Sequence, residues 1–519
     1  MDFDAIVIGS GFGGGPVAAR LAAAGYRVLV LERGRRWAVG DYPRNHDDPW
    51  IWDDRRPERR NGWFDFRMFP NMSVIQGAGV GGGSLVYANV SINGKEKTFE
   101  SGWPPDITFN SLQAHYAAVG TMLRVEPVPD TQWPKRTLLV KQAADNVGWS
   151  GRFERLELAV SFDQNWHYGL PQPHHHKHSQ AFTNPQGQEQ GTCVHLGECD
   201  IGCPVKARNT IDLTYIPLAE QHHAEVRPLH IVRSIAEVAG GYRVAFDRIS
   251  DGELKPGSQT ARLVILAAGS LGSTELLLRC RDEHAGLPNV SQRLGHRWSS
   301  NGDFLTPAIY AFRAVEPTRG PTITSAINLL DGTADGQEIF IEDGGFPDLA
   351  KGAMERLAGR PGATEQETAL IEGVRWLVRL RLFDSIMPWF AQGRDASDGV
   401  LSLRDKKLFL DWDVETSEPT IEAILRTHQK LAMATGGAAI VPPAWAWSQD
   451  LITPHPLGGA AMGTSASDGV VDFRGEVFGY RNLFVSDGSI VPKAIGLNPS
   501  KTIAALAEHV AARIIAEGR

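Results

Sequence analysis

The N-terminal pattern of apolar and polar positions predicts a strand, a helix and a second strand in close succession. Residues 5–8 form a short apolar run, residues 16–24 are alanine-rich with helical spacing, and residues 27–31 are again apolar. Short apolar runs of this kind are typical of parallel strands that are buried on both faces. The first thirty residues therefore predict the start of an α/β fold.

Two later segments extend the predicted sheet. Residues 224–232 predict a further strand. Residues 262–266 predict a buried strand that ends in small residues, followed by a helix from Thr274. Because ligands of doubly wound sheets bind beyond the carboxyl ends of the strands, we expect Ala268 and Gly269 at a ligand site.

The middle of the chain has a different character and predicts a second, antiparallel domain over residues 301–445. Residues 400–403 and 408–412 form the arms of a predicted hairpin. A helix is expected near residues 364–380, where apolar residues follow helical spacing at Leu370, Val374, Leu377 and Val378. Residues 35–70 predict irregular structure, which is either a functional loop or lid or a surface excursion packed by its own aromatic side chains.

The first glycine-rich turn has the spacing of an adenine-dinucleotide site. Gly9, Gly11 and Gly14 follow the first strand as G-x-G-x-x-G, which permits a tight turn, close approach of a pyrophosphate, and helix–strand packing. The helix that begins here offers free N–H groups to the phosphates. Glu32 ends the second strand and is placed to accept a hydrogen bond from a ribose 2′-hydroxyl. Its charge disfavours the 2′-phosphate of NADP.

A second glycine-rich stretch over residues 76–89 predicts contact with a flat ring. Six of its first eight residues are glycine or alanine, so no side chain fills the adjacent space. A flexible linker is the alternative. The stretch continues into Leu-Val-Tyr, which is unusual for a linker, so ring contact is favoured.

Composition narrows the classes of function and location. The formal net charge of −8 gives no electrostatic support for a nucleic-acid partner. No apolar run approaches the ~18 residues of a membrane span. The first strand begins at residue 3, leaving no room for a signal peptide, and four cysteines in 519 residues favour a reducing compartment. We therefore expect a cytoplasmic protein.

Three cysteines resemble an incomplete cluster-binding run. Cys193, Cys199 and Cys203 match the ferredoxin spacing, but the second cysteine of that pattern is missing. Because three thiolates cannot complete a four-cysteine cluster, we expect a metal-free remnant. A three-cysteine cluster assisted by His195 is the alternative. The histidines of residues 174–178 favour a solvated loop over a metal site, so no metal site is predicted.

Together with two C-terminal motifs, these features resemble the glucose–methanol–choline (GMC) oxidoreductases of the cholesterol-oxidase-like branch. The matching stretches are the first glycine motif, GVGGGSLVYAN, LAAGSLGSTELL, HPLGG and the closing DGS…GLNP before a long helix. The resemblance implies an α/β fold with a Rossmann-like FAD-binding domain, interleaved with an α+β substrate domain on a largely antiparallel sheet. The FAD-binding domain is expected to comprise residues 1–40, 70–100, 205–300 and 455–519. The substrate domain is expected to comprise residues 41–69, 101–204 and 301–454.

The resemblance also implies an alcohol-oxidising site. His455 would take or hold the hydroxyl proton, and Asn498 would hydrogen-bond the same oxygen and orient it. No histidine occurs between residues 76 and 89, so FAD should be bound noncovalently. The residues expected to bind FAD are Gly9, Gly11, Phe12, Gly14, Glu32, Gly79, Gly81, Gly82, Gly83, Ser84, Tyr87, Asn89, Val90, Ile231, Val232, Ala268, Gly269, Asp487, Gly488, Asn498 and Pro499.

The expected partners are a small-molecule alcohol and oxygen or another electron acceptor. A bulky, partly apolar alcohol, sterol-like or aromatic, is favoured by the aromatic content of residues 35–70 and by Trp389, Phe390, Trp445 and Trp447. Some cholesterol oxidases also isomerise a steroid double bond with a glutamate, for which Glu342 is the nearest candidate. A non-redox lyase of the same fold, similar to hydroxynitrile lyases, is the alternative function.

Overall fold

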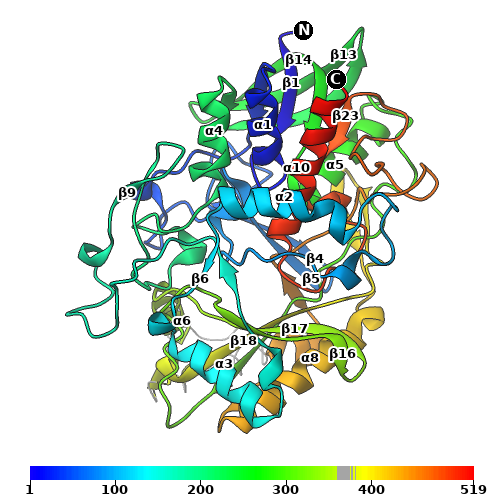
Figure 1. Ribbon diagram of the computed structural model, residues 1–519. Coiled ribbons are helices and arrows are strands. Elements are labelled where there is room, and N and C mark those ends of the chain that lie inside the picture. Colours follow the sequence, from blue (N-terminus) through cyan, green and yellow to red (C-terminus); the bar gives the residue numbers. More distant parts are fainter. Residues whose placement is uncertain (359–374, 376–377, 380–381) are drawn as a thin grey trace.

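A computed structural model describes residues 1–358, 375, 378–379 and 382–519, and two large sheets dominate it (Figure 1). The helix expected near residues 364–380 therefore lies, apart from three positions, outside the described residues. The expected combination of a Rossmann-like sheet with a largely antiparallel second sheet is confirmed.

The first sheet has seven strands and lies in the upper part of Figure 1. Its order is β11-β2-β1-β14-β13-β12, with β23 also paired to β14. The strands are β1 (Phe3–Ile8), β2 (Val28–Leu31), β11 (Glu225–Arg227), β12 (His230–Val238), β13 (Gly241–Ser250), β14 (Glu253–Leu266) and β23 (Leu483–Val485). Strand β1 runs parallel to both β2 and β14, as its apolar pattern predicts.

Helices pack around this sheet and build the larger hydrophobic core. They are α1 (Gly14–Ala23), α2 (Phe109–Met122), α4 (Tyr215–Gln221), α5 (Gly269–Asp282) and α10 (Ser500–Ala516). Helix α1 packs against α4 and α10, and α10 packs against α2, so the two chain ends lie in one layer (Figure 1). The predicted β-α-β start of the chain is confirmed.

Three predictions about local structure differ from the structure. Residues 224–232 form two strands, because Pro228 has no N–H for the ladder and Leu229 has a positive φ of 59°. Helix α5 begins at Gly269 instead of Thr274, because the distant Asp487 accepts a hydrogen bond from the Gly269 N–H at 2.8 Å. Residues 35–70 are only partly irregular, since two strands lie within them.

The second large sheet is antiparallel and has the order β21-β15-β18-β17-β16-β7. Its strands are β7 (Phe153–Arg155), β15 (Phe304–Ile309), β16 (Ser325–Ala334), β17 (Gln337–Asp343), β18 (Ile386–Gly393) and β21 (Ala438–Ala439). Helices α3 (Lys135–Asn146) and α8 (Val414–Ala434) pack on it around a separate core. The predicted hairpin is confirmed as β19 (Val400–Arg404) and β20 (Lys407–Asp411).

A four-stranded sheet of order β22-β5-β4-β3 leads the chain into the functional site. Its strands are β3 (Ile51–Trp52), β4 (Phe64–Phe69), β5 (Met72–Gly77) and β22 (Leu451–Thr453). The predicted domain boundary between residues 69 and 70 falls inside the β4–β5 hairpin. The division into two domains stays a prediction. Further short elements are β6 (Glu126–Pro127), β8 (Glu157–Leu158), β9 (Phe182–Thr183), β10 (Glu189–Gln190), α6 (Leu349–Ala358) and α9 (Pro443–Ser448).

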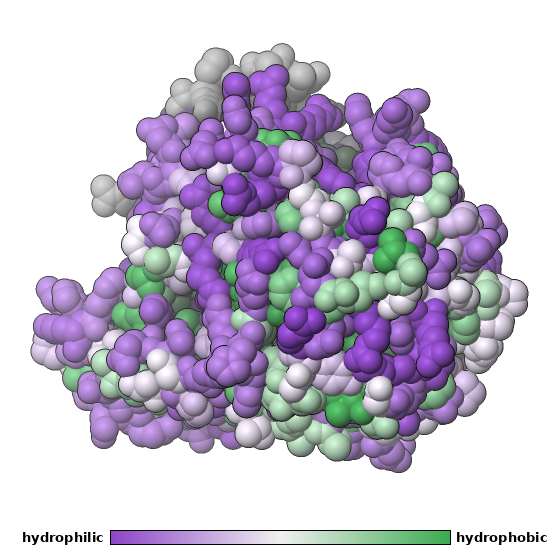
Figure 2. All heavy atoms as spheres, turned by 90° about the horizontal axis from the view of Figure 1, so that it is seen from above, coloured by the Kyte–Doolittle hydropathy of each residue, from purple (hydrophilic) through white to green (hydrophobic). Residues whose placement is uncertain are grey.

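The surface seen from above is mostly hydrophilic, with small apolar patches between charged side chains (Figure 2). Scattered apolar residues of this kind are ordinary for a protein surface. Within the described ranges, no helix combines the length and the hydropathy that crossing a membrane requires.

Candidate functional site

A cavity of about 1050 Å³ brings the sequence motifs together. Its wall includes the first glycine turn, Glu32, the carboxyl end of β14, His455 and Asn498. We call the part around Glu32 the cofactor side and the part around His455 and Asn498 the reaction side. Ligand sites of proteins usually measure about 300–1,000 Å³, so the cavity has room for a large ligand.

The glycines of the first turn are required by close packing. Gly9 has a φ of +100°, and a Cβ there would lie 2.3 Å from the carbonyl oxygen of Ala267. A Cβ on Gly14 would lie 2.0 Å from the Gly9 oxygen, so only glycine lets α1 approach the turn this closely. At Gly83, by contrast, a Cβ would meet nothing nearer than the Phe12 ring at 4.0 Å. The backbone at Gly83 therefore faces open space in the cavity.

The Glu32 carboxylate is held in place by the first glycine turn. It accepts hydrogen bonds from the Ser10 hydroxyl at 2.7 Å, the Ser10 N–H at 3.2 Å and the Gly34 N–H at 2.9 Å. Burial raises the pKa of Glu32, and these donors oppose the rise. Glu32 still lines the cavity, so it combines a structural role with access to a ligand.

The structure places most of the predicted cofactor residues on the cavity wall. Those that line it are Gly9, Gly11, Phe12, Glu32, Gly82, Gly83, Tyr87, Val90, Ile231, Val232, Ala268, Gly269, Asp487, Gly488, Asn498 and Pro499. Those that stand behind the wall are Gly14, Gly79, Gly81, Ser84 and Asn89.

The residues behind the wall hold the second glycine stretch in shape. Ser84 donates a hydrogen bond to the Gly81 oxygen at 2.8 Å, and Asn89 accepts one from Arg208 at 2.7 Å. Arg208 also donates to the backbone oxygens of Ser84, Leu85 and Tyr87. Sequence reasoning missed Arg208, because no local motif marks it.

Three helix N-termini lie at the cavity wall. The wall includes Gly13 before α1, Gly269 at the start of α5, and Pro499 before α10. Asp487 caps α5 through Gly269 and Ser273. The other two termini offer partial positive charge to a ligand with anionic groups.

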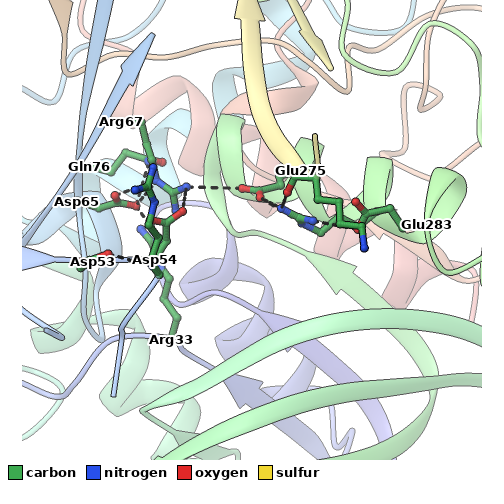
Figure 3. Close-up of polar contacts among 11 residues, drawn as sticks. Arg33, Asp53, Asp54, Asp65, Arg67, Gln76, Glu275 and Glu283 are labelled. Atoms are coloured by element: carbon green, nitrogen blue, oxygen red, sulfur yellow. Dashed lines mark hydrogen bonds and ion pairs between the residues drawn. The ribbon is translucent and has the colours of Figure 1, made fainter. Parts of the chain in front are cut away.

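A charged network borders the cofactor side (Figure 3). Asp65 on β4 pairs with Arg33 at 2.7 Å and with Arg67 at 2.9 Å. Arg67 reaches on toward Glu275 of α5 at 3.8 Å, and Glu275 pairs with Arg279 at 2.6 Å. The network therefore ties the end of β2, the β4–β5 hairpin and α5 together beside the cavity.

On the reaction side, His455 is anchored through its backbone and through its ring. Thr453 ends β22, and its Oγ1 accepts a hydrogen bond from the His455 N–H at 2.9 Å. The ring Nδ1 lies 2.9 Å from Oδ1 of Asp303, a carboxyl group that is 1% exposed. The His455 side chain is 18% exposed and lines the cavity opposite the Phe390 ring, whose centroid is 6.2 Å away.

Asn498 lies next to a buried carboxyl group. Its Nδ2 donates to Oε2 of Glu342 at 3.3 Å, and Gln392 donates to the same oxygen at 2.9 Å. Burial raises the pKa of Glu342 to about 8, more than these two amides lower it. Oδ1 of Asn498 is buried without a hydrogen-bond partner, which marks a polar atom with unused capacity at the cavity wall.

Two other groups of candidates lie apart from this arrangement. The ring of His195 stacks on Trp166 with centroids 4.1 Å apart, and its Nε2 lies 3.2 Å from Oε1 of Gln132, so stacking and one ring nitrogen are directed to these two side chains. Among the described residues, no group of three or more His, Cys, Asp or Glu side chains is arranged to hold a metal ion. Of Trp389, Phe390, Trp445 and Trp447, Phe390 alone lines the cavity, and Trp52, Phe64 and Phe66 of the 35–70 segment line it as well.

Known proteins resemble this chain over nearly its full length. The GMC oxidoreductase family models match residues 29–298 and 407–507. A cholesterol oxidase of Acinetobacter baumannii is 29% identical, covering 99% of this chain and 95% of the relative. A long-chain-alcohol oxidase of Arabidopsis thaliana is 22% identical, covering 99% of this chain and 67% of the relative. The solved structure of a fungal aryl-alcohol oxidase shares the fold, with a TM-score of 0.62, 17% identity and coverage of 100% and 99%.

Proposed function

Because the chain belongs to the GMC oxidoreductase family and is an FAD-dependent oxidoreductase acting on CH–OH groups, we propose that it oxidises a bulky, partly apolar alcohol to a carbonyl compound. The acceptor that completes the cycle is oxygen or another oxidant. The observation that carries the proposal is the pair His455 and Asn498 on the wall of the same cavity as both glycine motifs.

The lining of the cavity supports our proposal that FAD binds noncovalently. The open backbone at Gly83 and the N-terminus of α1 suit a flat ring and a pyrophosphate, and Glu32 suits the ribose. The second glycine stretch contains no histidine for covalent attachment. FAD, when bound, supplies the acceptor for the hydride that leaves the carbinol carbon.

The side chains on the reaction side handle the hydroxyl group. Nδ1 of His455 is occupied by Asp303, so Nε2 remains to take the hydroxyl proton. Asn498 uses one amide hydrogen on Glu342, which leaves its second for the alcohol oxygen. Because two groups contact one oxygen, they hold it in a fixed orientation and stabilise the charge that develops on it as the proton leaves.

The cavity wall supports an apolar substrate. Phe66, Leu305 and Ile452 line the cavity, and each is 41–49% exposed. Phe390 adds an aromatic face beside His455. The names of the relatives, a cholesterol oxidase and a long-chain-alcohol oxidase, agree with an alcohol of this kind.

Anaerobic mixing tests the proposal. The FAD-loaded protein is mixed with sterols, long-chain alcohols and aryl alcohols, with sugars as a polar control. We expect bleaching of the oxidised flavin band by at least one apolar alcohol and none by sugars. Cleavage of a cyanohydrin with the flavin still oxidised would instead support the lyase alternative, and reduction by sugars alone would contradict the apolar substrate.

A further inference from the structure

Resting on the proposed function, we propose that Asp303 is the positioning residue of the reaction. It holds the His455 imidazole with the proton on Nδ1 and with Nε2 free for the alcohol. It also supplies the negative charge that stabilises the ring when protonation turns it into an imidazolium. Asp303 touches neither substrate nor cofactor in this assignment, and it acts entirely through His455.

The first support is the geometry of the contact. Asp303 directly precedes β15, and its Oδ1 lies 2.9 Å from Nδ1 of His455. A carboxylate oxygen accepts hydrogen bonds, so the ring nitrogen must be the donor and carry the proton. The other ring nitrogen is then an acceptor, which is the state that a proton-accepting imidazole requires.

The second support is that Asp303 is itself fixed. Its Oδ2 lies 2.6 Å from the Thr453 hydroxyl, which also accepts the His455 backbone N–H and contacts the Ser300 oxygen at 2.9 Å. Thr453 is fully buried and Asp303 is 1% exposed, so water does not compete for these contacts. The side chains of Asp303 and Thr453 contact each other, and together they hold both the backbone and the ring of His455.

The third support is electrostatic. Burial raises the pKa of Asp303, and among the main influences that oppose the rise, His455 is the one that can carry positive charge. Arg136 instead pairs with Asp343, a different carboxylate. When His455 takes a proton, the new cation therefore has a buried carboxyl group at 2.9 Å.

The alternative is that Asp303 only joins β15 to the segment after β22. A matched control separates the two roles. Asp395 is also buried, and it accepts hydrogen bonds from Ser299, Ser300 and Ser397 without any contact to His455 that the structure shows. A purely structural role predicts similar behaviour of the two carboxylates.

The test uses Asp303→Ala, Asp303→Asn and Asp395→Asn in anaerobic stopped-flow reduction by an alcohol that the wild type oxidises. We expect Asp303→Ala to lower the limiting reduction rate by about 10²-fold, with FAD content and substrate affinity little changed. Asp303→Asn keeps an acceptor oxygen but loses the charge, so it should recover part of the loss. Asp395→Asn should lose stability while its reduction rate stays near that of the wild type.

A second readout needs no turnover. In protein labelled with ¹⁵N-histidine, the resonance that disappears in His455→Ala identifies His455, and its shifts report the tautomer. We expect the Nδ1–H form in the wild type and its loss in Asp303→Ala. An Nε2–H tautomer in the wild type, or equal rate losses in Asp303→Ala and Asp395→Asn, would overturn the assignment. If no alcohol reduces the flavin, the proposed function fails, and the tautomer still decides the role of Asp303.

Discussion

The two sides of the cavity hold buried carboxyl groups in opposite electrostatic settings. Beside the cofactor side, burial would raise the pKa of Asp65, but Arg33 and Arg67 outweigh it and the pKa is lowered. On the reaction side, the only donors to Glu342 that the structure shows are amides, and burial raises its pKa to about 8. The difference indicates that paired cations can outweigh the effect of burial on the pKa of a carboxyl group.

This contrast has a consequence for the chemistry. The cofactor side carries fixed charges that bind strands and a helix together (Figure 3). On the reaction side near Asn498, the raised pKa of Glu342, about 8, keeps this carboxyl group mostly protonated at neutral pH, so Glu342 itself adds little negative charge beside Asn498. A neutral alcohol is the substrate that such a site suits best.

The largest expected effect lies on the reaction side. His455→Ala should lower the rate of flavin reduction about 10²–10⁴-fold, the usual worth of a positioned general base. Asn498→Ala should lower it less, since a proton acceptor remains. The double variant should lose less than the product of both factors, because both residues address one oxygen. Stopped-flow reduction measures all three, and full multiplicative losses would show that the residues act separately.

The next effect tests the charged network. Asp65→Asn should lower the free energy of unfolding by about 3 kcal/mol, because two partly buried guanidinium groups lose their shared anion. Asp54→Asn is the control, since Asp54 contacts Arg67 from a side chain that is 53% exposed; its cost should stay below about 1 kcal/mol. Urea unfolding measures both. Equal costs would mean that burial of Asp65 adds nothing.

Glu342→Gln sharpens the comparison through pH. The folded-state pKa of Glu342, about 8, lies above the ordinary value of 4.5, so its contribution to stability is present below pH 4.5 and is lost as the pH rises through 8. Glutamine does not titrate. The stability of the variant relative to wild type should therefore increase between pH 5 and 7, by about 2.5 kcal/mol. A difference that does not change with pH would show that Glu342 is not protonated in the folded protein.

The smallest expected effect concerns FAD binding by Glu32 on the cofactor side. Glu32→Gln should weaken FAD binding by about 1.5 kcal/mol, the lower end for a hydrogen bond to a charged group, because Ser10 and Gly34 already engage the carboxylate. Titration of the apoprotein with FAD measures the change. Unchanged affinity would mean that Glu32 serves the glycine turn alone.

The same contrast explains what the sequence could predict. The β1-α1-β2 unit was predictable because its signals are local: apolar runs, spaced glycines and a terminal Glu32. His455 and Asn498 were found because each sits in a recognisable motif. Asp303 was not predicted from sequence, and Glu342 was named only as the nearest candidate for an isomerase glutamate, since the two residues meet His455 and Asn498 across 152 and 156 residues. No local sequence pattern shows that the described side-chain donors to Glu342 are amides instead of cations.

The first residue of helix α5 was predicted wrongly for a related reason. Its predicted start at Thr274 followed the small residues of the turn, whereas the true start at Gly269 depends on a cap from Asp487, which is 218 residues away. Local propensity therefore located the helix but not its first turn. The strand break at Pro228 could have been predicted from the sequence, because proline has no N–H group for the hydrogen bonds between strands.

The measurement that tests the central claim most directly is the stoichiometry of a single anaerobic turnover. FAD-loaded protein is mixed with one equivalent of an apolar alcohol, and carbonyl product and reduced flavin are quantified in the same sample. The account predicts one carbonyl formed for each flavin reduced, and formation of both slowed together in His455→Ala. Carbonyl product in the presence of fully oxidised flavin would contradict it.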